Sequence, residues 1–355
     1  MNNYVNGFML SDTEGYFSDI MTFSDRAKNM ALLALTTFFM EESAKSTQKF
    51  FESKFGQNFP NLIKMSEKSP LVFVNSEELF DFPKPILHKI VYVGSLGMRK
   101  PKPLPEDWER LLSQSDSGVV LFSFGSVANT TSMPLPWKRS LLDAFDSFPS
   151  YTFIVKSDEQ KPEDFVPKGI KHPKNVKFVS WAPQADLLGH SKLKAAIFHG
   201  GANGVMEACI NGKPLVLIPL MGDQFYFANL AEKYAVGISV AKSDVPTSVV
   251  KEALKKVLTI PRYTENAQRL SRMIRSKPVK SEELLVKWVE FVAEFKELPN
   301  LQPYAVNLSF IEYFCLDIIA ALAAVLSIVL YFIFLFLRYF IRFLFSRSKQ
   351  KAKSE

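Results

Sequence analysis

The stretch from residue 178 to residue 224 constrains the fold more than any other part of the chain. It holds two short apolar runs, at residues 195–198 and 214–220, with the sequence HGGANG and a helical pattern at residues 205–210 between them. This order of strand, glycine-rich turn, helix and strand predicts a βαβ unit. In such a unit the turn leads into a helix N-terminus, whose free N–H groups form an anion site. The glycines of the turn would let a phosphate approach the backbone closely.

Polar and aromatic side chains follow one another along this stretch in an order that suits one ligand. Asn203 and Glu207 are four residues apart, so they lie on one face of the predicted helix. Together, the side chains and the turn could form a pocket for a nucleotide-diphosphate sugar. The candidate residues are Trp181, Gln184, His199, Gly201, Asn203, Gly204, Glu207, Asp223 and Gln224.

This pattern resembles the signature of the UDP-glycosyltransferases, specifically the membrane-bound UDP-glucuronosyltransferase branch. The resemblance extends from about residue 17 to the C-terminus. It implies an α/β fold of the two-domain GT-B type, with a complete Rossmann-like C-terminal donor domain, a truncated N-terminal domain and one C-terminal transmembrane helix. The matching residues are W-x-P-Q (Trp181, Pro183, Gln184), HGGANG (His199 to Gly204), Glu207, Gly212, Pro214, Pro219, Asp223 and Gln224.

The resemblance also implies a role for each part of the donor pocket. Trp181 would stack on uracil, Gln184 would read the edge of the base, and Glu207 would accept hydrogen bonds from the ribose hydroxyls. Phosphate would be held by the glycine N–H groups and by the side chains of His199 and Ser126, the latter in an FGS turn. The sugar hydroxyls would be held by Asp223 and Gln224.

Structural roles remain open for the same side chains. Core packing is the alternative for Trp181 and His199, and a plain turn is the alternative for Ser126. For four further side chains, the alternatives are capping of a helix (Asp223 and Gln224) or a solvated helix face (Asn203 and Glu207).

Two residues depart from the pattern of the family. Phe198 stands where a small polar residue usually precedes the histidine, and Phe227 stands where an asparagine usually follows the Asp-Gln pair. Both substitutions predict a different shape at the sugar end of the pocket.

Strands and helices alternate regularly from about residue 107 onwards. This alternation predicts a parallel sheet with helices on both faces, and ligands of such sheets bind beyond the carboxyl ends of the strands. The turns that carry the candidate residues all follow predicted strands, so they should converge on one edge. The predicted strands are residues 119–124, 151–156, 175–179, 195–198, 214–220 and 237–240.

We expect five parts along the chain. Residues 17–59 read mostly as helix, at 30–40 and 45–55, and the glycine- and proline-rich residues 94–105 read as an interdomain linker. Residues 1–16 lack the apolar core of a signal peptide. The first two parts are a remnant of the N-terminal acceptor-side domain (1–90) and a UDP-sugar-binding domain (91–300), which ends in a crossing helix at 281–297. The last three are a juxtamembrane segment (301–317), a transmembrane helix (318–337) and a basic cytoplasmic tail (338–355).

Residues 318–337 form an uncharged, apolar run of 20 residues, which is the length that spans a bilayer. A buried core helix is the alternative. The basic residues that follow predict a cytoplasmic tail and a lumenal body. Residues 351–355 look like a lysine-based endoplasmic-reticulum retrieval signal, or else a plain solvated tail. Asn129 and Asn307 begin glycosylation sequons that a lumenal body would expose.

Charge and cysteine content exclude several classes of function. The formal net charge is +7, most of it in the tail, so no basic stripe indicates a nucleic-acid partner. Cys209 and Cys315 give no disulfide framework, and Cys209 reads as a small core residue. No grouping of His, Cys, Asp and Glu has metal-ligand spacing. We therefore expect no metal and no cofactor, with the UDP-sugar acting as a co-substrate.

The reaction implied by the resemblance is an inverting transfer of a glucuronosyl group, with glucosyl as the alternative, from UDP-sugar to a small lipophilic acceptor. It needs a base for the acceptor proton. In the family, a histidine and an aspartate that precede the matched part supply it, so we expect no catalytic base in this chain. His88, His172 and His190 read as surface residues. The alternative reading is a non-catalytic UDP-sugar-binding membrane partner of full-length transferases, as a homo- or hetero-oligomer.

Overall fold

The computed structural model describes residues 17–126, 128–243 and 245–351, with residues 343–351 described by backbone alone. The chain divides into two compact units, Met1–Leu298 and Pro299–Glu355, and each is described by itself. The N-terminal residues 1–16 and the last four residues of the suggested retrieval signal lie outside the described residues.

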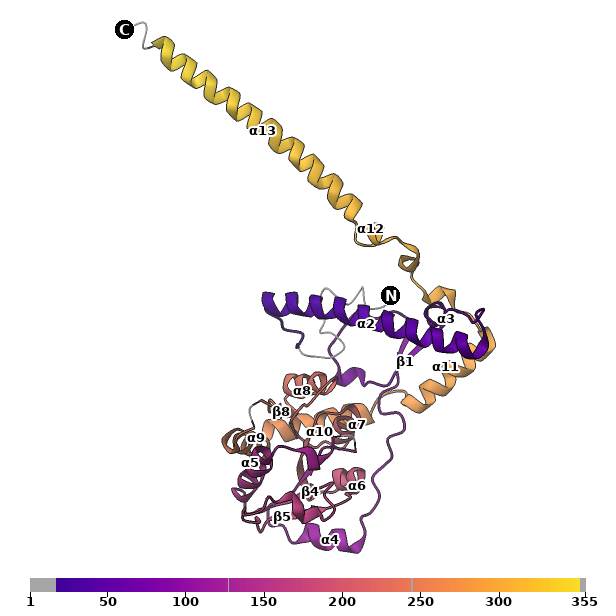
Figure 1. The fold of residues 1–355 in the computed structure, drawn as a ribbon, viewed down its shortest axis with the longest axis vertical. Helices are drawn as coiled ribbons and strands as arrows, with labels where there is room; N and C mark the ends of the chain where they lie inside the picture. Colours follow the sequence, from indigo (N-terminus) through magenta and orange to yellow (C-terminus); the bar gives the residue numbers. More distant parts are fainter. Residues whose placement is uncertain (1–16, 127, 244, 352–355) are drawn as a thin grey trace. The chain divides into compact units, whose positions relative to one another are not determined.

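A six-stranded parallel sheet forms the centre of the first unit (Figure 1). Its order is β5-β4-β3-β6-β7-β8, so the chain builds outwards from β3 to β5 and then returns to the other side of β3. The strand order therefore reverses between β3 and β6, the point at which such sheets bind ligands. The strands are β3 (Gly118–Ser123), β4 (Tyr151–Lys156), β5 (Val176–Val179), β6 (Leu193–Phe198), β7 (Leu215–Leu217) and β8 (Gly237–Ser239).

Helices cover both faces of this sheet because successive side chains of a strand point to opposite sides. In β3, Val119 and Leu121 belong to one buried apolar cluster, and Val120 and Phe122 belong to the other. The second cluster is completed by α5 (Leu135–Asp146) and α9 (Thr247–Thr259). The first is completed by α4 (Glu106–Ser113), α6 (Gln184–Gly189), α7 (Ala202–Ile210), α8 (Gln224–Lys233) and α10 (Pro261–Arg275).

The predicted alternation is confirmed, but β7 is shorter than the predicted strand at residues 214–220. The N–H of Ile218 still donates to the carbonyl of Phe198 at 2.9 Å. Pro219 follows and has no N–H, so the ladder ends there and the chain turns towards α8.

One long helix, α2 (Phe23–Phe55), replaces the two predicted helical stretches at 30–40 and 45–55. Residues 41–44, Glu-Glu-Ser-Ala, contain neither glycine nor proline, so the hydrogen bonds of the helix continue through them. Asn29 is its one buried residue, and apolar side chains such as Phe38 and Phe39 are exposed. A short helix α3 (Leu62–Glu67) and a parallel pair of strands, β1 (Val72–Val74) and β2 (Ile90–Tyr92), follow.

The connection between β1 and β2 contains the short helical turn η1 (Glu78–Phe80). This turn and the residues after it pack into the first apolar cluster of the large sheet. Phe80 and Phe82 are buried there together with Leu112 and Leu121. Residues on the N-terminal side of the predicted boundary at residue 90 thus contribute to this core. The boundary itself remains a prediction.

The predicted helix at 281–297 is α11 (Ser281–Phe295). None of its side chains is buried, so its apolar spacing does not reflect core packing within the described residues. The Ser281 hydroxyl at its start donates to the Gly94 carbonyl at 2.7 Å.

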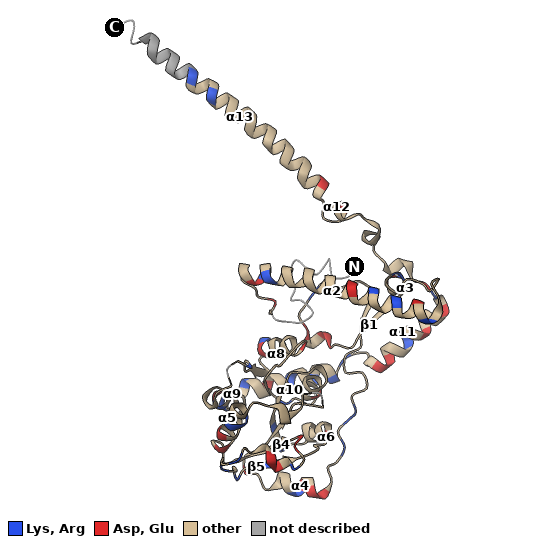
Figure 2. Ribbon diagram, in the orientation of Figure 1, with Lys and Arg blue, Asp and Glu red and all other residues tan. Residues whose placement is uncertain are grey.

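In its described part, residues 299–351, the second unit holds three short helical turns followed by a long helix. These are η4 (Pro299–Leu301), η5 (Tyr304–Asn307), α12 (Phe310–Tyr313) and the long helix α13 (Leu316–Lys351). Residues Leu316–Arg342 are long and apolar enough to cross a membrane. Figure 2 shows this helix free of charged residues between Asp317 and Arg338. None of the apolar window is buried, so the core-helix alternative is not supported.

Candidate functional site

The candidate residues gather where the strand order reverses. Ser126 follows β3, His199 follows β6, and these two strands are neighbours in the sheet. Because the strands are parallel, both turns lie beyond the same carboxyl edge. The predicted convergence of these turns on one edge is therefore present in the fold.

Glycines surround the imidazole of His199. A Cβ on Gly201 would lie 2.6 Å from His199 Nε2, and a Cβ on Gly125 would lie 3.0 Å from Cε1. Gly125 also has φ +73, and Gly200 has φ +92 with the Gln224 carbonyl 2.9 Å from its Cβ position. These three positions therefore accept only glycine without displacing a neighbour.

Burial lowers the pKa of His199, although the nearby carboxylate of Asp223 opposes that shift. The imidazole is therefore neutral at neutral pH. Its Nδ1 is buried and has no hydrogen-bond partner among the described residues. A neutral ring at a glycine turn can hold a ligand oxygen through its N–H without the cost of burying a charge.

A cavity of about 370 Å³ lies beside this turn. Its walls include Trp181, of which 72% is exposed, and the carboxylate of Glu207. The Gln184 amide donates to that carboxylate at 2.7 Å. The remaining lining residues come from the end of β3 and the turn after it, the end of β4, the turn before α6 and its first turn, and the segment before α4: Arg99, Ser123, Gly125, Ser126, Lys156, Ala182, Pro183 and Ala185.

The other predicted residues lie around the His199 turn or serve the local backbone. Asn203 is exposed at the start of α7, and Gly204 packs near Phe198. Asp223 precedes α8 without capping it through its side chain, so the capping alternative does not explain this residue. Gln224 Oε1 accepts from the backbone N–H groups of Leu220 (2.7 Å) and Met221 (3.1 Å). Gln224 therefore shapes the turn before α8 with one end of its amide.

The two departures from the family pattern, Phe198 and Phe227, are 2% and 8% exposed and belong to the first apolar cluster. Both side chains fill the core beneath the turns, which explains why an apolar residue is accepted at each position.

Lys156 is a pocket residue that the sequence analysis missed. Its ammonium donates to the Gly125 carbonyl at 3.0 Å and pairs with Asp158. Asp158 in turn accepts from the N–H and the hydroxyl of Thr130, both at 3.0 Å. Lys156 ends β4, so the rule that ligands bind at carboxyl ends of strands could have identified it.

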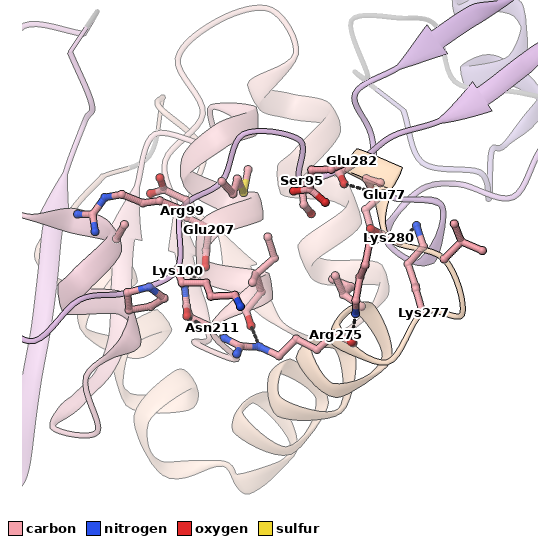
Figure 3. A pocket seen from close by; sticks show the side chains of 18 residues that line it. Glu77, Ser95, Arg99, Lys100, Glu207, Asn211, Arg275, Lys277, Lys280 and Glu282 are labelled. Atoms are coloured by element: carbon pink, nitrogen blue, oxygen red, sulfur yellow. Dashed lines mark hydrogen bonds and ion pairs between the residues drawn. The ribbon is translucent and has the colours of Figure 1, made fainter. Parts of the chain in front are cut away.

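A second cavity of about 390 Å³ adjoins the first and shares Arg99 and Glu207 with it (Figure 3). Several of its charged groups make internal contacts. Arg275 donates to the Ile210 carbonyl at 3.0 Å, so it caps the end of α7. Lys277 pairs with Glu77 at 3.2 Å and with Glu78 at 2.8 Å.

The other histidines lie away from the carboxyl edge or face solvent. His190 pairs with Glu109 (Nε2 to Oε2 3.3 Å), but it precedes β6 and so lies at the opposite edge of the sheet from His199. His88 and His172 are exposed. Among the described residues, no group of three or more His, Cys, Asp or Glu side chains could hold a metal ion.

Comparison with known proteins decides the family. A family model described as "UDP-glucoronosyl and UDP-glucosyl transferase" matches residues 6–351. The chain belongs to this family. Human UDP-glucuronosyltransferase 1A1 is 33% identical over 309 residues, which cover 87% of this chain and 56% of the human protein. Rat UDP-glucuronosyltransferase 1-2 is 32% identical over 311 residues, with the same shares.

The chain therefore spans little more than half the length of these relatives. Among solved structures, the glycotransferase of kitacinnamycin matches with a TM-score of 0.53 at 16% identity, over 70% of this chain and 61% of that one. UDP-glucose: anthocyanidin 3-O-glucosyltransferase in complex with UDP matches with a TM-score of 0.51 at 23% identity, over 63% and 53%. These likenesses confirm the predicted α/β fold of the GT-B type.

Proposed function

We propose that this chain supplies the donor-binding part of a UDP-sugar transferase. It would act on small lipophilic acceptors with inversion at the sugar carbon and without a metal, moving a glucuronosyl group, or a glucosyl group as the alternative. The single observation that carries the proposal is the cavity at the reversal of the strand order. Trp181, Gln184, Glu207 and Ser126 line it together, although they follow three different strands.

The proposed binding mode follows from the chemistry of each wall. Uracil stacks on the exposed face of Trp181, and the ribose hydroxyls donate to the Glu207 carboxylate, which Gln184 already orients. The diphosphate meets the Ser126 turn, the N-terminal N–H groups of α7 and the ammonium of Lys156. The sugar extends towards Asp223 at the start of α8.

In the reaction, the acceptor oxygen forms a bond to the sugar C1 while the bond from C1 to the β-phosphate oxygen breaks. Negative charge then develops on the departing UDP. Lys156 and the N–H of His199 would stabilise that charge, which is the role of preorganised donors in transfer reactions. The acceptor proton goes to a base that we do not place among the four histidines.

A second candidate is a non-catalytic partner that binds UDP-sugar and associates with longer transferases in the membrane. The positions of His190, at the opposite edge of the sheet, and of His199, enclosed by glycines, favour this reading for the chain by itself. In either case we propose the membrane of the endoplasmic reticulum as its location.

Calorimetry with UDP on the full chain in detergent micelles tests the proposal. We expect binding that a chelator leaves unchanged. Trp181→Ala should weaken it by roughly 1–3 kcal/mol, as for other bases stacked on aromatic side chains. Trp288→Ala is the matched control, because Trp288 lies in α11 outside the cavity and contacts Phe291. Absence of binding, or loss of binding with the chelator, would contradict the proposal.

A further inference from the structure

The segment predicted to be the interdomain linker, residues 94–105, is bound to α6 beside the cavity. Both oxygens of Asp186 accept from the guanidinium of Arg99, with Nη2 to Oδ2 at 2.7 Å, and Oδ1 also accepts from the backbone N–H of Lys102 at 2.7 Å. Pro101 packs so closely on Gly189 that a Cβ there would lie 2.3 Å from the proline ring. Residues 99–102 therefore contact α6 at Asp186 and at Gly189.

This fastening lies at the nucleoside end of the cavity. Asp186 is in the first turn of α6, two residues after Gln184 and five after Trp181. Arg99 lines the cavity beside Glu207, as Figure 3 shows from the adjoining side. The contacts of Arg99 and Gln184 thus hold neighbouring parts of the same wall.

We propose that Arg99, held by Asp186, is a positioning residue for the nucleoside end of the donor site, so that donor binding and the conformation of the linker are coupled. The inference rests on the proposed function. An exposed ion pair alone would contribute little to the stability of this contact. Here the fork is bidentate and its carboxylate also accepts a backbone N–H, so the contact joins the linker to the first turn of α6, the helix that follows Trp181.

Coupling of this kind is reciprocal: if an ordered linker improves nucleotide binding, then the bound nucleotide orders the linker by the same factor. The linker suits this role because Pro101, Pro103 and Pro105 limit its other conformations.

The first test compares the affinities of uridine, UMP and UDP for the full chain in detergent micelles. Arg99→Gln should weaken all three by the same factor, about tenfold for loss of a charge-assisted contact. Arg99→Lys should lose most of that factor as well, because an ammonium cannot form the bidentate fork. Arg110→Gln is the matched control: it removes another arginine–carboxylate pair, with Glu106, outside the cavity.

A loss that grows with the number of phosphates would overturn the inference, since Arg99 would then be a phosphate ligand. Unchanged affinities for all three ligands would overturn it too. Failure of the wild-type chain to bind any of the three would overturn the proposed function itself, which separates the two outcomes.

The second test needs no substituted arginine. Hydrogen–deuterium exchange can follow the peptide of residues 98–105. It has few exchangeable N–H groups because three of its residues are proline, and one of the N–H groups that remain is that of Lys102, which donates to Asp186. UDP should slow exchange of this peptide in the wild-type chain. Asp186→Asn should speed its exchange without ligand and abolish the effect of UDP. Equal exchange with and without UDP in the wild-type chain would contradict the coupling.

Discussion

The residues of the site act through close fits that a single methyl group would disturb. Gly201 has φ −62, a conformation open to any residue, so its lack of a side chain matters only for space. We predict that Gly201→Ala displaces the imidazole of His199, destabilises the fold by roughly 1–3 kcal/mol as overpacking does, and weakens UDP binding. Thermal unfolding and calorimetry measure the two effects.

A double-mutant cycle gives the control for this substitution. In a His199→Ala background the added methyl group meets no imidazole, so Gly201→Ala should cost much less there. Equal costs in both backgrounds would show that the methyl group acts on something other than the histidine.

Glu77 should make stability depend on pH. Burial raises the pKa of this carboxyl to about 6, although Lys277 opposes the shift. The folded state therefore binds this proton more tightly than the unfolded chain. The resulting stabilisation is complete below about pH 4.5 and is lost as pH rises through 6, by up to roughly 2 kcal/mol. Glu77→Gln should remove this loss, as measured by unfolding at pH 5 and pH 7.5.

Glu78→Gln provides the comparison with the opposite sign. Burial, the largest single effect, would raise the pKa of Glu78, but the hydrogen bonds it accepts and the charge of Lys277 together lower the pKa. Its contribution is present at neutral pH and is lost on acidification. If the two variants show the same dependence on pH, the assignment of the raised pKa to Glu77 is wrong.

At this scale, most of the cavity residues that the sequence predicts come from the stretch at residues 178–224. Trp181, Gln184 and Glu207 come from one continuous pattern, and the structure places them around one cavity. Lys156 and Arg99 line the same cavity but come from other parts of the chain. The position of Arg99 depends on a long-range contact with Asp186 that no local pattern encodes.

At the scale of elements, a buried carboxylate joins the turn after β1 to α8. Asp81, 4% exposed, accepts from the hydroxyls of Tyr226 and Tyr92, the latter at 3.1 Å, and pairs with Lys84 at 3.3 Å. Burial, together with Asp81, raises the pKa of both tyrosines, so each remains a hydroxyl donor at neutral pH. The Tyr234 hydroxyl adds a bond to the Asp81 carbonyl at 2.6 Å.

We predict that Tyr226→Phe destabilises the first unit by about 2 kcal/mol, because it removes a hydrogen bond to a buried charged group. Chemical unfolding measures the change. Tyr304→Phe is the control, since that tyrosine is 77% exposed in the other unit. A loss of less than about 0.5 kcal/mol, the range of ordinary surface substitutions, would show that the Asp81 contact does not hold the turn to α8.

The elements also show which patterns are informative. The strands and helices after residue 107 have periodic apolar residues bounded by glycine or proline, and their types are predicted correctly. The pattern in residues 78–82 is too short to indicate burial. Phe80 and Phe82 are core residues because the chain returns there against α10 and, through Phe82 and Tyr226, against α8, tertiary contacts that local sequence does not specify.

For the whole molecule, the strand order is the feature that creates the site, and the sequence constrains it only in part. Parallel strands with short helical crossovers follow from the alternation, and each crossover is right-handed in nearly all proteins. Nothing in the local sequence determines that β6 pairs with β3 and not with β5. That choice, seen only in the structure, brings Ser126 and His199 to adjacent strand ends.

Orientation in the membrane is the last prediction. The apolar window Leu316–Arg342 has Asp317 near its start and Arg338 and Arg342 near its end, and the sequence beyond adds further lysines and arginines. Basic residues next to a span remain on the cytoplasmic side. We therefore predict that the tail faces the cytoplasm and that residues 17–298 lie in the lumen.

Protease added to sealed microsomes that contain this chain should remove only the tail, leaving a protected fragment that antibodies against the first unit detect. Detergent should then expose that fragment to complete digestion, which controls for intrinsic resistance. Replacing Arg338 and Arg342 by Gln should increase the fraction of inverted chains, because it weakens the charge bias next to the span. Digestion of the first unit in sealed vesicles, with the tail protected, would mean that the orientation is reversed and that the donor site faces the cytoplasm.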